Sequence, residues 1–423
     1  MAAPANFVAT LRTYGRSFWA ANVSELFERI AFYGMTPMLV LYLTEVRGLP
    51  TGIAIQTGAD FGLAAYGLPA LSGFVADAVG YRRALLGAYV LLVLGYFSVG
   101  HATSYGGILI GLLVVAFGTS LVKPIITGTV QKTGTEHTRA VGFSVYYTLV
   151  NVGGALGPNV SGRVRGALGS GWVFNVSAMV AAVALLVTLL VYREPRASDA
   201  GAEPEADRSV GTFLRSFVKV VADVRLMLLF VFVAGWWSLF FEFFNVMPLY
   251  LRDDLHAGSA TIGFVNSLEA ITVIALQVVV GFVVRDWKPI RAVVAAVVIS
   301  SVGVAAISAS PSIALAGAGV IVFALGEMIY SAHFYHYLGT LAPAGQVGMY
   351  MGFAFLPIAL GSWLSGKIGA PAVAYFRDVL HAPQLMWLAF AGVGAVSALG
   401  VFVLSRTARS HPRAETAPSE TRG

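Results

Sequence analysis

The chain has 423 residues, of which 57% are hydrophobic and only 11% are charged, and its mean hydropathy is +0.77. Soluble domains of this size do not have such a composition, so the sequence indicates an all-α polytopic membrane protein. The net charge of +6 would suit a nucleic-acid partner, but its distribution along the chain excludes that class, and the lack of cysteine excludes structural disulfides and thiolate metal sites.

Apolar stretches alternate with short polar, glycine or proline breaks along the whole chain. Each stretch is close to the roughly 20 apolar residues that a helix needs to cross a bilayer. We therefore predict twelve membrane-spanning helices, at 17–43, 53–77, 83–101, 106–131, 139–163, 171–192, 223–250, 259–284, 290–309, 312–338, 345–369 and 384–406.

The longest polar interruption begins at Arg193 and is rich in Pro, Glu, Asp and Gly, a composition that does not form a packed core. Its last part, 210–223, is amphipathic, as expected of a segment on the membrane surface. We predict a six-helix bundle over 1–192, a cytoplasmic linker over 193–222, a second six-helix bundle over 223–407 and a disordered cytoplasmic tail over 408–423.

Basic residues are distributed unevenly between the two ends of these helices. With the N-terminus in the cytoplasm, nineteen of the 27 Lys and Arg residues lie on the cytoplasmic side, and Arg29 and Lys123 lie inside the membrane. By the positive-inside rule both termini are cytoplasmic, and the first 16 residues lack the apolar core of a cleavable signal. We therefore predict a multi-pass protein of the cell (plasma or inner) membrane. The six basic residues on the outer side are Arg47, Arg163, Arg165, Arg252, Lys367 and Arg377.

The first predicted helix carries three charges near its middle, at Glu25, Glu28 and Arg29. On a helix of 3.6 residues per turn they share one face, with Tyr33 at its margin. A charged side chain at the bilayer centre costs about 2.5–3.5 kcal/mol, so charges inside a membrane normally serve a function. Glu25 and Arg29 are also spaced for an i,i+4 ion pair. The alternative interpretation is a structural salt bridge that holds helices together.

The segment 25–35, ELFERIAFYGM, resembles the ExxERxxxYGM signature of the proton-dependent oligopeptide transporter family, a branch of the major facilitator superfamily. The resemblance implies two six-helix bundles and a proton-coupled symporter that imports di- or tripeptides, or a similar small zwitterion, by alternating access. It implies a transporter rather than an enzyme, a proton as coupling ion, no cofactor, and a monomer as the working unit. It assigns proton coupling to Glu25, Glu28 and Arg29, and substrate binding to Arg29, Tyr33 and Tyr66.

A weak internal repeat supports two related halves. Residues 73–84 recur in looser form 208 residues later, and each copy lies between the second and third helices of its half. The first copy is similar to the GxxxDxxGxRR loop motif of the major facilitator superfamily, which implies that Asp77, Arg82 and Arg83 act as a gate at the cytoplasmic face. The alternative is that the two arginines only enforce topology.

Two further helices of the first half carry polar residues. Lys123, in GTSLVKP, resembles the family's FKP segment. A lysine at this depth needs either a carboxylate partner, for which Glu25 and Glu28 are the candidates, or a lowered pKa. Tyr147 and Asn151, in YYTLVNVGG, resemble the family's FYxxINxG motif. Asn151 alone would equally suit a helix-packing hydrogen bond, worth about 0.6–2 kcal/mol. Beside the other motifs, we favour substrate binding for Lys123, Tyr147 and Asn151.

The second half contributes acids inside the membrane. Glu242 lies among aromatic and aliphatic residues, a setting in which a carboxyl group is suited to load and unload a proton, and it is the predicted proton carrier of this half. Asn245, on the same helix face, is predicted to bind substrate. Glu269 is a further predicted binding residue, and it departs from the family, which commonly has Asn-Pro where this chain has Glu269-Ala270.

Glu327 and Ser331 lie in GEMIYSA, which resembles the family's GExxxSP segment. The resemblance implies that Glu327 receives the amino terminus of a peptide and lies across the cavity from Arg29 and Lys123. Charge-assisted hydrogen bonds at both ends would then select a zwitterion by its length.

Other functions remain open on the same sequence. A proton-driven exporter of drugs or metabolites would have the same fold. A membrane-embedded enzyme is disfavoured, because neither a Ser/His/acid set nor a phosphate-binding loop is visible. His333 and His336 have i,i+3 spacing, but no third ligand shares their face, so no metal site is predicted.

Overall fold

The computed structural model describes residues 7–69, 78–135, 138–195, 222–341 and 353–407. Over these ranges the chain is almost entirely helical and contains no strand. Eleven of the described helical segments are long and apolar enough to cross a membrane, and α3 (Thr51–Gly67) lies between the first two of them. The all-α, many-spanning fold predicted from the hydrophobic windows is therefore confirmed.

The helices begin and end close to the predicted positions. After the short α1 (Phe7–Thr13), the first half contains α2 (Arg16–Glu45), α3, α5 (Tyr81–His101), α6 (Tyr105–Thr133), α7 (Arg139–Leu168) and α8 (Trp172–Leu190). The second half contains α10 (Val224–Asn245), α11 (Met247–Leu249), the π-helical turn η1 (Tyr250–Asp254), α12 (Ser259–Val284), α13 (Pro289–Ile307), α14 (Ile313–Leu341), η2 (Phe353–Phe355), α16 (Leu356–Val373), η3 (Ala374–Val379), η4 (Pro383–Leu385) and α17 (Met386–Thr407).

Some predicted segments lie outside the described residues. They are the end of the predicted helix 53–77, most of the linker with its amphipathic part, the beginning of the predicted helix 345–369, and the tail.

Local signals explain where individual helices begin and end. The side chain of Ser104 accepts a hydrogen bond from the backbone N–H of Gly107 at the start of α6, and Asp223 caps α10 in the same way. Gly169, with φ +93°, ends α7 in a conformation that favours glycine. The break between α10 and α11 precedes Pro248, which lacks the N–H that an unbroken helix needs.

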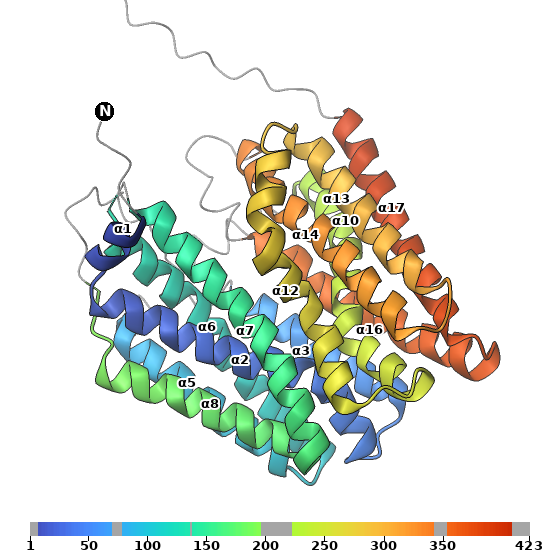
Figure 1. The fold of residues 1–423 in the computed structure, drawn as a ribbon, viewed down its shortest axis with the longest axis horizontal. Helices are drawn as coiled ribbons and strands as arrows, with labels where there is room; N and C mark the ends of the chain where they lie inside the picture. The colour runs from blue at the N-terminus through green and yellow to red at the C-terminus, as the bar shows by residue number, and fades with distance from the viewer. Residues whose placement is uncertain (1–6, 70–77, 136–137, 196–221, 342–352, 408–423) are drawn as a thin grey trace, which may run out of the picture.

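Two apolar clusters hold the helices in two groups. One cluster is built from α2 to α8 around side chains such as Phe18, Tyr89 and Phe174. The other is built mainly from α10 to α17 around Trp236 and Trp387. Figure 1 shows the first group, from blue to green, beside the second, from yellow to red. Large apolar side chains also point outward, as lipid-facing residues do; examples are Leu190, Val278 and Phe282.

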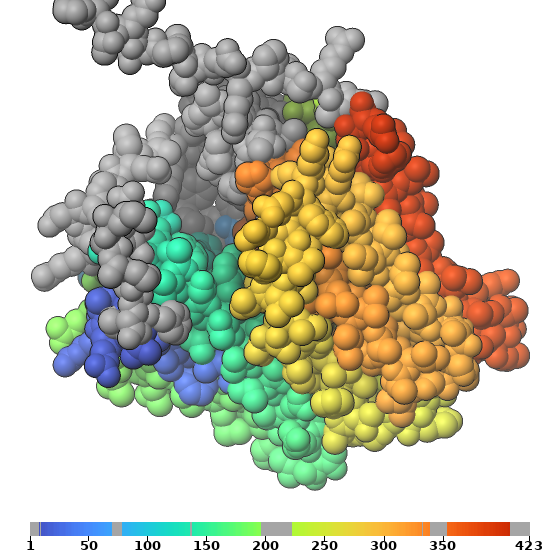
Figure 2. Space-filling model, turned by 45° about the horizontal axis from the view of Figure 1, so that its top comes forward, coloured from blue at the N-terminus to red at the C-terminus, as the bar shows by residue number. Residues whose placement is uncertain are grey.

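The two groups touch mainly through two pairs of helices, α7 with α12 and α3 with α16. Figure 2 shows the surfaces of α7 and α12 in direct contact. Their backbones approach closely at Gly162 and Gly263, because a methyl group built on Gly263 would lie only 2.3 Å from the carbonyl oxygen of Pro158. Small residues at such crossings allow helices to pack tightly inside a membrane. These contacts place the polar residues of α2 and α7 beside those of α12 and α14.

Candidate functional site

The charged residues of α2 form one buried cluster. Glu25, Glu28 and Arg29 are 1%, 0% and 6% exposed. Arg29 Nε lies 3.3 Å from Glu25 Oε1, so the predicted i,i+4 ion pair forms, and Arg29 also pairs with Glu28. Thr119 of α6 completes the cluster, since its hydroxyl donates to Glu28 over 2.5 Å and accepts from Arg29 over 3.1 Å. The guanidinium is thus held by three groups of its own half.

Glu25 is the less completely satisfied of the two acids. The hydroxyl of Tyr146, on α7, donates to Glu25 Oε1 over 3.5 Å. Glu25 Oε2 is buried and has no hydrogen-bond partner among the described residues. Two carboxylates and one guanidinium leave one negative charge inside the cluster, which no ion pair within the cluster compensates, although the charge of Lys123 acts on Glu25 from nearby. One proton would neutralise the cluster, and the open oxygen of Glu25 is available to hold it.

Lys123 lies close to this cluster without pairing with it. Glu25 and Glu28 are near enough to act on its charge, but the described residues place no carboxylate within 4 Å of its ammonium group. Lys123 Nζ instead lies 4.6 Å from the ring centre of Phe355, in η2 of the second half. The direct carboxylate partner expected for Lys123 is therefore not found. Arg29, Lys123, Tyr66 and Phe355 are among the residues that line a cavity of about 20 Å³.

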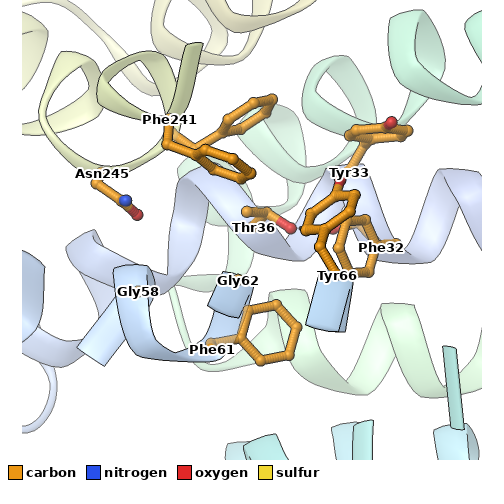
Figure 3. A pocket seen from close by; sticks show the side chains of 10 residues that line it. Phe32, Tyr33, Thr36, Gly58, Phe61, Gly62, Tyr66, Phe241 and Asn245 are labelled. Atoms are coloured by element: carbon orange, nitrogen blue, oxygen red, sulfur yellow. The ribbon is translucent and has the colours of Figure 1, made fainter. Parts of the chain in front are cut away.

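A second small cavity, of about 10 Å³, lies between α2, α3 and α10. Figure 3 shows Tyr33, Thr36 and Tyr66 around a space that Phe241 and Asn245 border from the other half. The two tyrosine hydroxyl groups are close enough to interact electrostatically. Each cavity has room for about one water molecule. Tyr66 lines both, so the two cavities share a wall.

Two acids of the second half lie together near these tyrosines. Glu269 on α12 and Glu327 on α14 are close enough for their carboxyl groups to interact electrostatically. Both side chains are half-buried, and both act electrostatically on the hydroxyl of Tyr33, as Arg29 does with the opposite sign. The predicted arrangement had Glu327 facing Arg29 and Lys123, and this stays a prediction; the hydroxyl of Tyr33 is within electrostatic range of both Glu327 and Arg29, and the sequence did not indicate the nearness of Glu269 to Glu327.

The remaining predicted binding residues, Tyr147, Asn151, Asn245 and Ser331, do not form one cluster with the charged residues. Tyr147 is exposed, and the amide of Asn151 donates to the carbonyl oxygen of Tyr147 within α7, over 2.9 Å. Asn245 borders the smaller cavity and donates to Ser365 of α16 over 2.9 Å. Ser331 is exposed on α14.

Glu242 lies apart from both cavities. It is 1% exposed, and neither carboxylate oxygen has a hydrogen-bond partner among the described residues. It faces α16, where a methyl group built on Gly369 would lie 2.7 Å from Glu242 Oε2. Helix packing surrounds this carboxyl group, as the aromatic sequence around it predicts. Glu242 itself lines neither cavity, although its chain neighbour Phe241 lines the smaller one.

The loop motif before α5 connects helices within the first half. Arg82 donates to the carbonyl oxygens of Tyr192 and Leu189, at the end of α8, over 3.0 Å each. Glu194 accepts the backbone N–H groups of Tyr81 and Arg82 at the start of α5. Sequence reasoning missed Glu194, because nothing in its spacing indicates a cap for a helix more than 100 residues earlier. Arg83 is exposed, and Asp77 lies outside the described residues.

A network of ion pairs joins the two halves at the ends of α2, α7 and η1, on the side that the sequence places outside the cell. Arg252 of η1 donates to Glu45 over 3.0 Å and to Thr44 over 2.9 Å. Arg165 of α7 pairs with the same Glu45 and donates to Ser259 of α12 over 2.7 Å. The sequence marked both arginines only as topology signals and did not single out Glu45.

Comparisons with known proteins agree with this architecture. Residues 22–366 match the family model described as the Major Facilitator Superfamily. The multidrug resistance protein MdtH of Aeromonas salmonicida is 24% identical over 402 residues, which are 93% of this chain and 96% of that protein. The peptide transporter YePEPT of Yersinia enterocolitica is 32% identical over 182 residues, which are 40% of this chain and 35% of that protein.

Among solved structures, an auto-inhibited peptide transporter of the POT family superposes with a TM-score of 0.76 at 18% identity, covering 93% of this chain and 98% of the other. The predicted fold with two helical bundles is thus confirmed.

Proposed function

This chain belongs to the major facilitator superfamily, and from that premise we propose that it is a proton-coupled symporter that imports di- or tripeptides or a similar small zwitterion. The observation that carries the proposal is the opposite charge of the two walls around Tyr33. Arg29 and Lys123 lie on the side of the first half, and the acid pair of α12 and α14 lies on the side of the second. The 32% identity to a peptide transporter over 182 residues, which are 40% of this chain, supports the same substrate class.

Substrate binding uses both walls. Of the two cations that line the larger cavity, Lys123 has the fewer partners among the described residues, so it is suited to bind the carboxylate of a zwitterion, with Arg29 beside it. Glu327 receives the ammonium group at the other end. Tyr33, Tyr66, Tyr147, Asn151, Asn245, Glu269 and Ser331 complete the site.

Proton coupling centres on the cluster of α2. In the unprotonated cluster Arg29 is held by Glu25, Glu28 and Thr119, and is not free to bind a substrate. A proton on either carboxyl weakens its hold on Arg29, which then turns toward the carboxylate of the substrate. Protonation and substrate binding thereby favour each other. Glu242 is the proton carrier of the second half.

Alternating access needs one end of the molecule to close while the other opens. In our proposal both termini are cytoplasmic, the protein lies in the cell (plasma or inner) membrane as a monomer, and the halves 1–192 and 223–407 move about the linker 193–222. The ion pairs of Glu45 with Arg165 and Arg252 are the outer gate. Arg82 and Arg83, at the start of α5, belong with Asp77 to the inner gate.

A second candidate is a proton-driven exporter on the same fold, favoured by the 24% identity to a multidrug resistance protein over 93% of the chain. Proteoliposomes separate the two. We expect a pH gradient, acidic outside, to drive the uptake of alanyl-alanine, and no gradient-driven movement of a cationic dye. Gradient-driven dye efflux without dipeptide uptake would establish the exporter instead.

The variant Glu28→Gln tests the coupling. It keeps the size of the side chain and removes the charge that holds Arg29, so we expect it to exchange substrate across the membrane while it loses uphill uptake. The matched control is Asp286→Asn, since that carboxylate is 83% exposed and remote from the site. Unimpaired accumulation by Glu28→Gln would refute the proposed coupling.

A further inference from the structure

Of the two histidines that the sequence singles out, His333 of α14 has no role in the proposed transport cycle. Its side chain is buried, with 6% of its surface exposed, whereas His336, one turn later, is exposed. The ring lies between two backbone carbonyl groups. Nδ1 is 3.0 Å from the oxygen of Ile329, one turn earlier in the same helix, and Nε2 is 3.1 Å from the oxygen of Val284, the last residue of α12. His333 therefore connects two helices near the end that the sequence places in the cytoplasm.

The two partners of the ring are both acceptors, and this fixes the number of protons that suits the site. A carbonyl oxygen accepts hydrogen bonds and donates none, so each ring nitrogen has to supply the hydrogen. A neutral imidazole carries a single N–H and would turn a lone pair toward the other oxygen. Only the doubly protonated imidazolium donates to Ile329 and Val284 together. The geometry thus suits a ring that has bound a second proton.

The position of Val284 favours a positive charge for a separate reason. The last carbonyl groups of a helix lack partners in a following turn and form the negative end of the helix dipole. The oxygen of Val284 accepts the N–H of Trp287 over 3.0 Å and has a second lone pair for His333. Arg285 and Asp286, which follow α12, are 60% and 83% exposed and pair with each other over 3.1 Å. Their ion pair is therefore open to the surroundings, whereas the contact of His333 with α12 is buried.

The other titratable and charged groups of the helices around His333 have different surroundings. Glu327, the acid of α14, is half-buried and lies six residues earlier, about 9 Å along the helix axis. The hydroxyl of Tyr330 accepts the indole N–H of Trp237 over 3.3 Å. The remaining groups are exposed, apart from one half-buried tyrosine, and they are Lys288 and Arg291 of α13, Arg225 of α10, and His336 and Tyr337 of α14.

We propose that His333 is a further proton-binding site, at the cytoplasmic end of the second half, and that the bound proton fixes the end of α12 to α14. When the proton leaves for water, one of the two hydrogen bonds is lost and the end of α12 is held less tightly. Helix α12 also packs against α7 of the first half. Acid on the cytoplasmic side therefore stabilises the arrangement seen here, in which ion pairs join the halves at the outer end. The inference concerns proton binding alone and holds for an importer and an exporter alike.

The first test compares melting temperatures in detergent at about pH 5.5 and about pH 8, on either side of the range in which histidine usually changes charge. His333→Gln supplies an uncharged amide donor in place of the ring, and the exposed His336→Gln is the matched control. The protonated ring makes both bonds and the neutral ring only one, so the stabilising effect of His333 is present at low pH and decreases as the pH rises. We expect the excess of the wild-type melting temperature over that of His333→Gln to fall to less than about half at the higher pH. An excess that does not fall, or an equal effect of His336→Gln, would overturn the inference.

The second test measures a distance in protein that keeps His333. Because the chain has no cysteine, nitroxide labels on Asp286→Cys, after α12, and His336→Cys, on α14, report the separation of the two helix ends alone. We expect a narrow distance distribution at about pH 5.5, a broader or longer one at about pH 8, and no pH response once His333→Gln is added. An unchanged distribution in the protein that keeps His333 would overturn the inference whether or not His333→Gln folds, and so would a pH response that persists in folded His333→Gln. Failure of dipeptide uptake would refute the proposed function and leave this inference standing.

Discussion

Removing Arg252 should open the outer end of the transporter more often. Arg252 is the residue of η1 that bonds both Glu45 and Thr44 at the end of α2, so it joins the second half directly to the first. Arg252→Gln keeps a polar side chain of moderate length and removes the charge. Both contacts to α2 are then weakened, while Arg165 keeps its own ion pair with Glu45.

The size of the effect follows from the burial of the pair. The side chains of Arg252 and Glu45 are 21% and 29% exposed. A hydrogen bond to a charged group contributes about 1.5–3 kcal/mol when shielded from water, whereas an exposed ion pair contributes about 0.2–1 kcal/mol. Partial exposure places the two contacts together at about 1–2 kcal/mol. The ratio of outward-open to outward-closed molecules should therefore rise about five- to thirtyfold.

The chain contains no cysteine, so a single introduced thiol reports the opening without background. Thr36 borders the smaller cavity below the gate, and Thr36→Cys can be labelled from outside the cell with a membrane-impermeant maleimide. We expect Arg252→Gln to increase the labelling rate about five- to thirtyfold over Thr36→Cys alone. Arg285→Gln is the matched control, because the pair of Arg285 with Asp286 is exposed and lies within one half. An unchanged rate in Arg252→Gln, or an equal increase in Arg285→Gln, would refute the gate.

Three further predictions concern packing, capping and the isolated acid. Gly263→Ala should lower the free energy of unfolding in detergent by about 1–3 kcal/mol, because the added methyl group would meet the carbonyl oxygen of Pro158. The control is Gly281→Ala in the same helix. Its methyl group meets nothing within 4 Å, so this change should be neutral or stabilising. Glu194→Ala should lower the free energy of unfolding by about 1 kcal/mol, because two backbone N–H groups at the start of α5 lose their acceptor. The control is Arg83→Ala, which changes an exposed side chain and should alter stability by less than about 0.5 kcal/mol. Equal melting temperatures of the two variants would contradict the cap. Glu242→Gln should leave the melting temperature unchanged, since neither carboxylate oxygen of Glu242 has a hydrogen-bond partner among the described residues. The variant should lose gradient-driven uptake but still exchange substrate across the membrane. Retained uphill uptake would remove Glu242 from the proton path.

The helices and the ion pair of α2 could be predicted because both depend on local spacing. Apolar stretches that end at glycine, proline or polar residues define membrane-spanning helices almost by themselves. In the same way Glu25 and Arg29 are four residues apart, and one helical turn brings them together whatever the rest of the chain does.

The contacts between halves could not be predicted, because they depend on how distant helices meet. Glu269 and Glu327 lie on different helices, and no spacing rule connects them. The topology count placed Arg165 and Arg252 among the few basic residues on the outer side and assigned them no further role. Their shared ion-pair partner, Glu45, was therefore not predicted. Lys123 was expected to pair with an acid of its own half, but its ammonium group lies over the ring of Phe355, a contact that exists only when the halves are together.

The pairing of α7 with α12 and of α3 with α16 also governs how a solute reaches the centre of the molecule. Helix α2, which carries Arg29 and Tyr33, packs against both α3 and α7 and so lies between these two lines of contact. Within these two pairs the described helices approach one another closely, as at Gly263 against Pro158 and at Gly62 against Ser362. At these two contacts a compound dissolved in the bilayer meets packed helices. Entry through water at one of the two ends suits a charged and well-hydrated cargo better than an oily one.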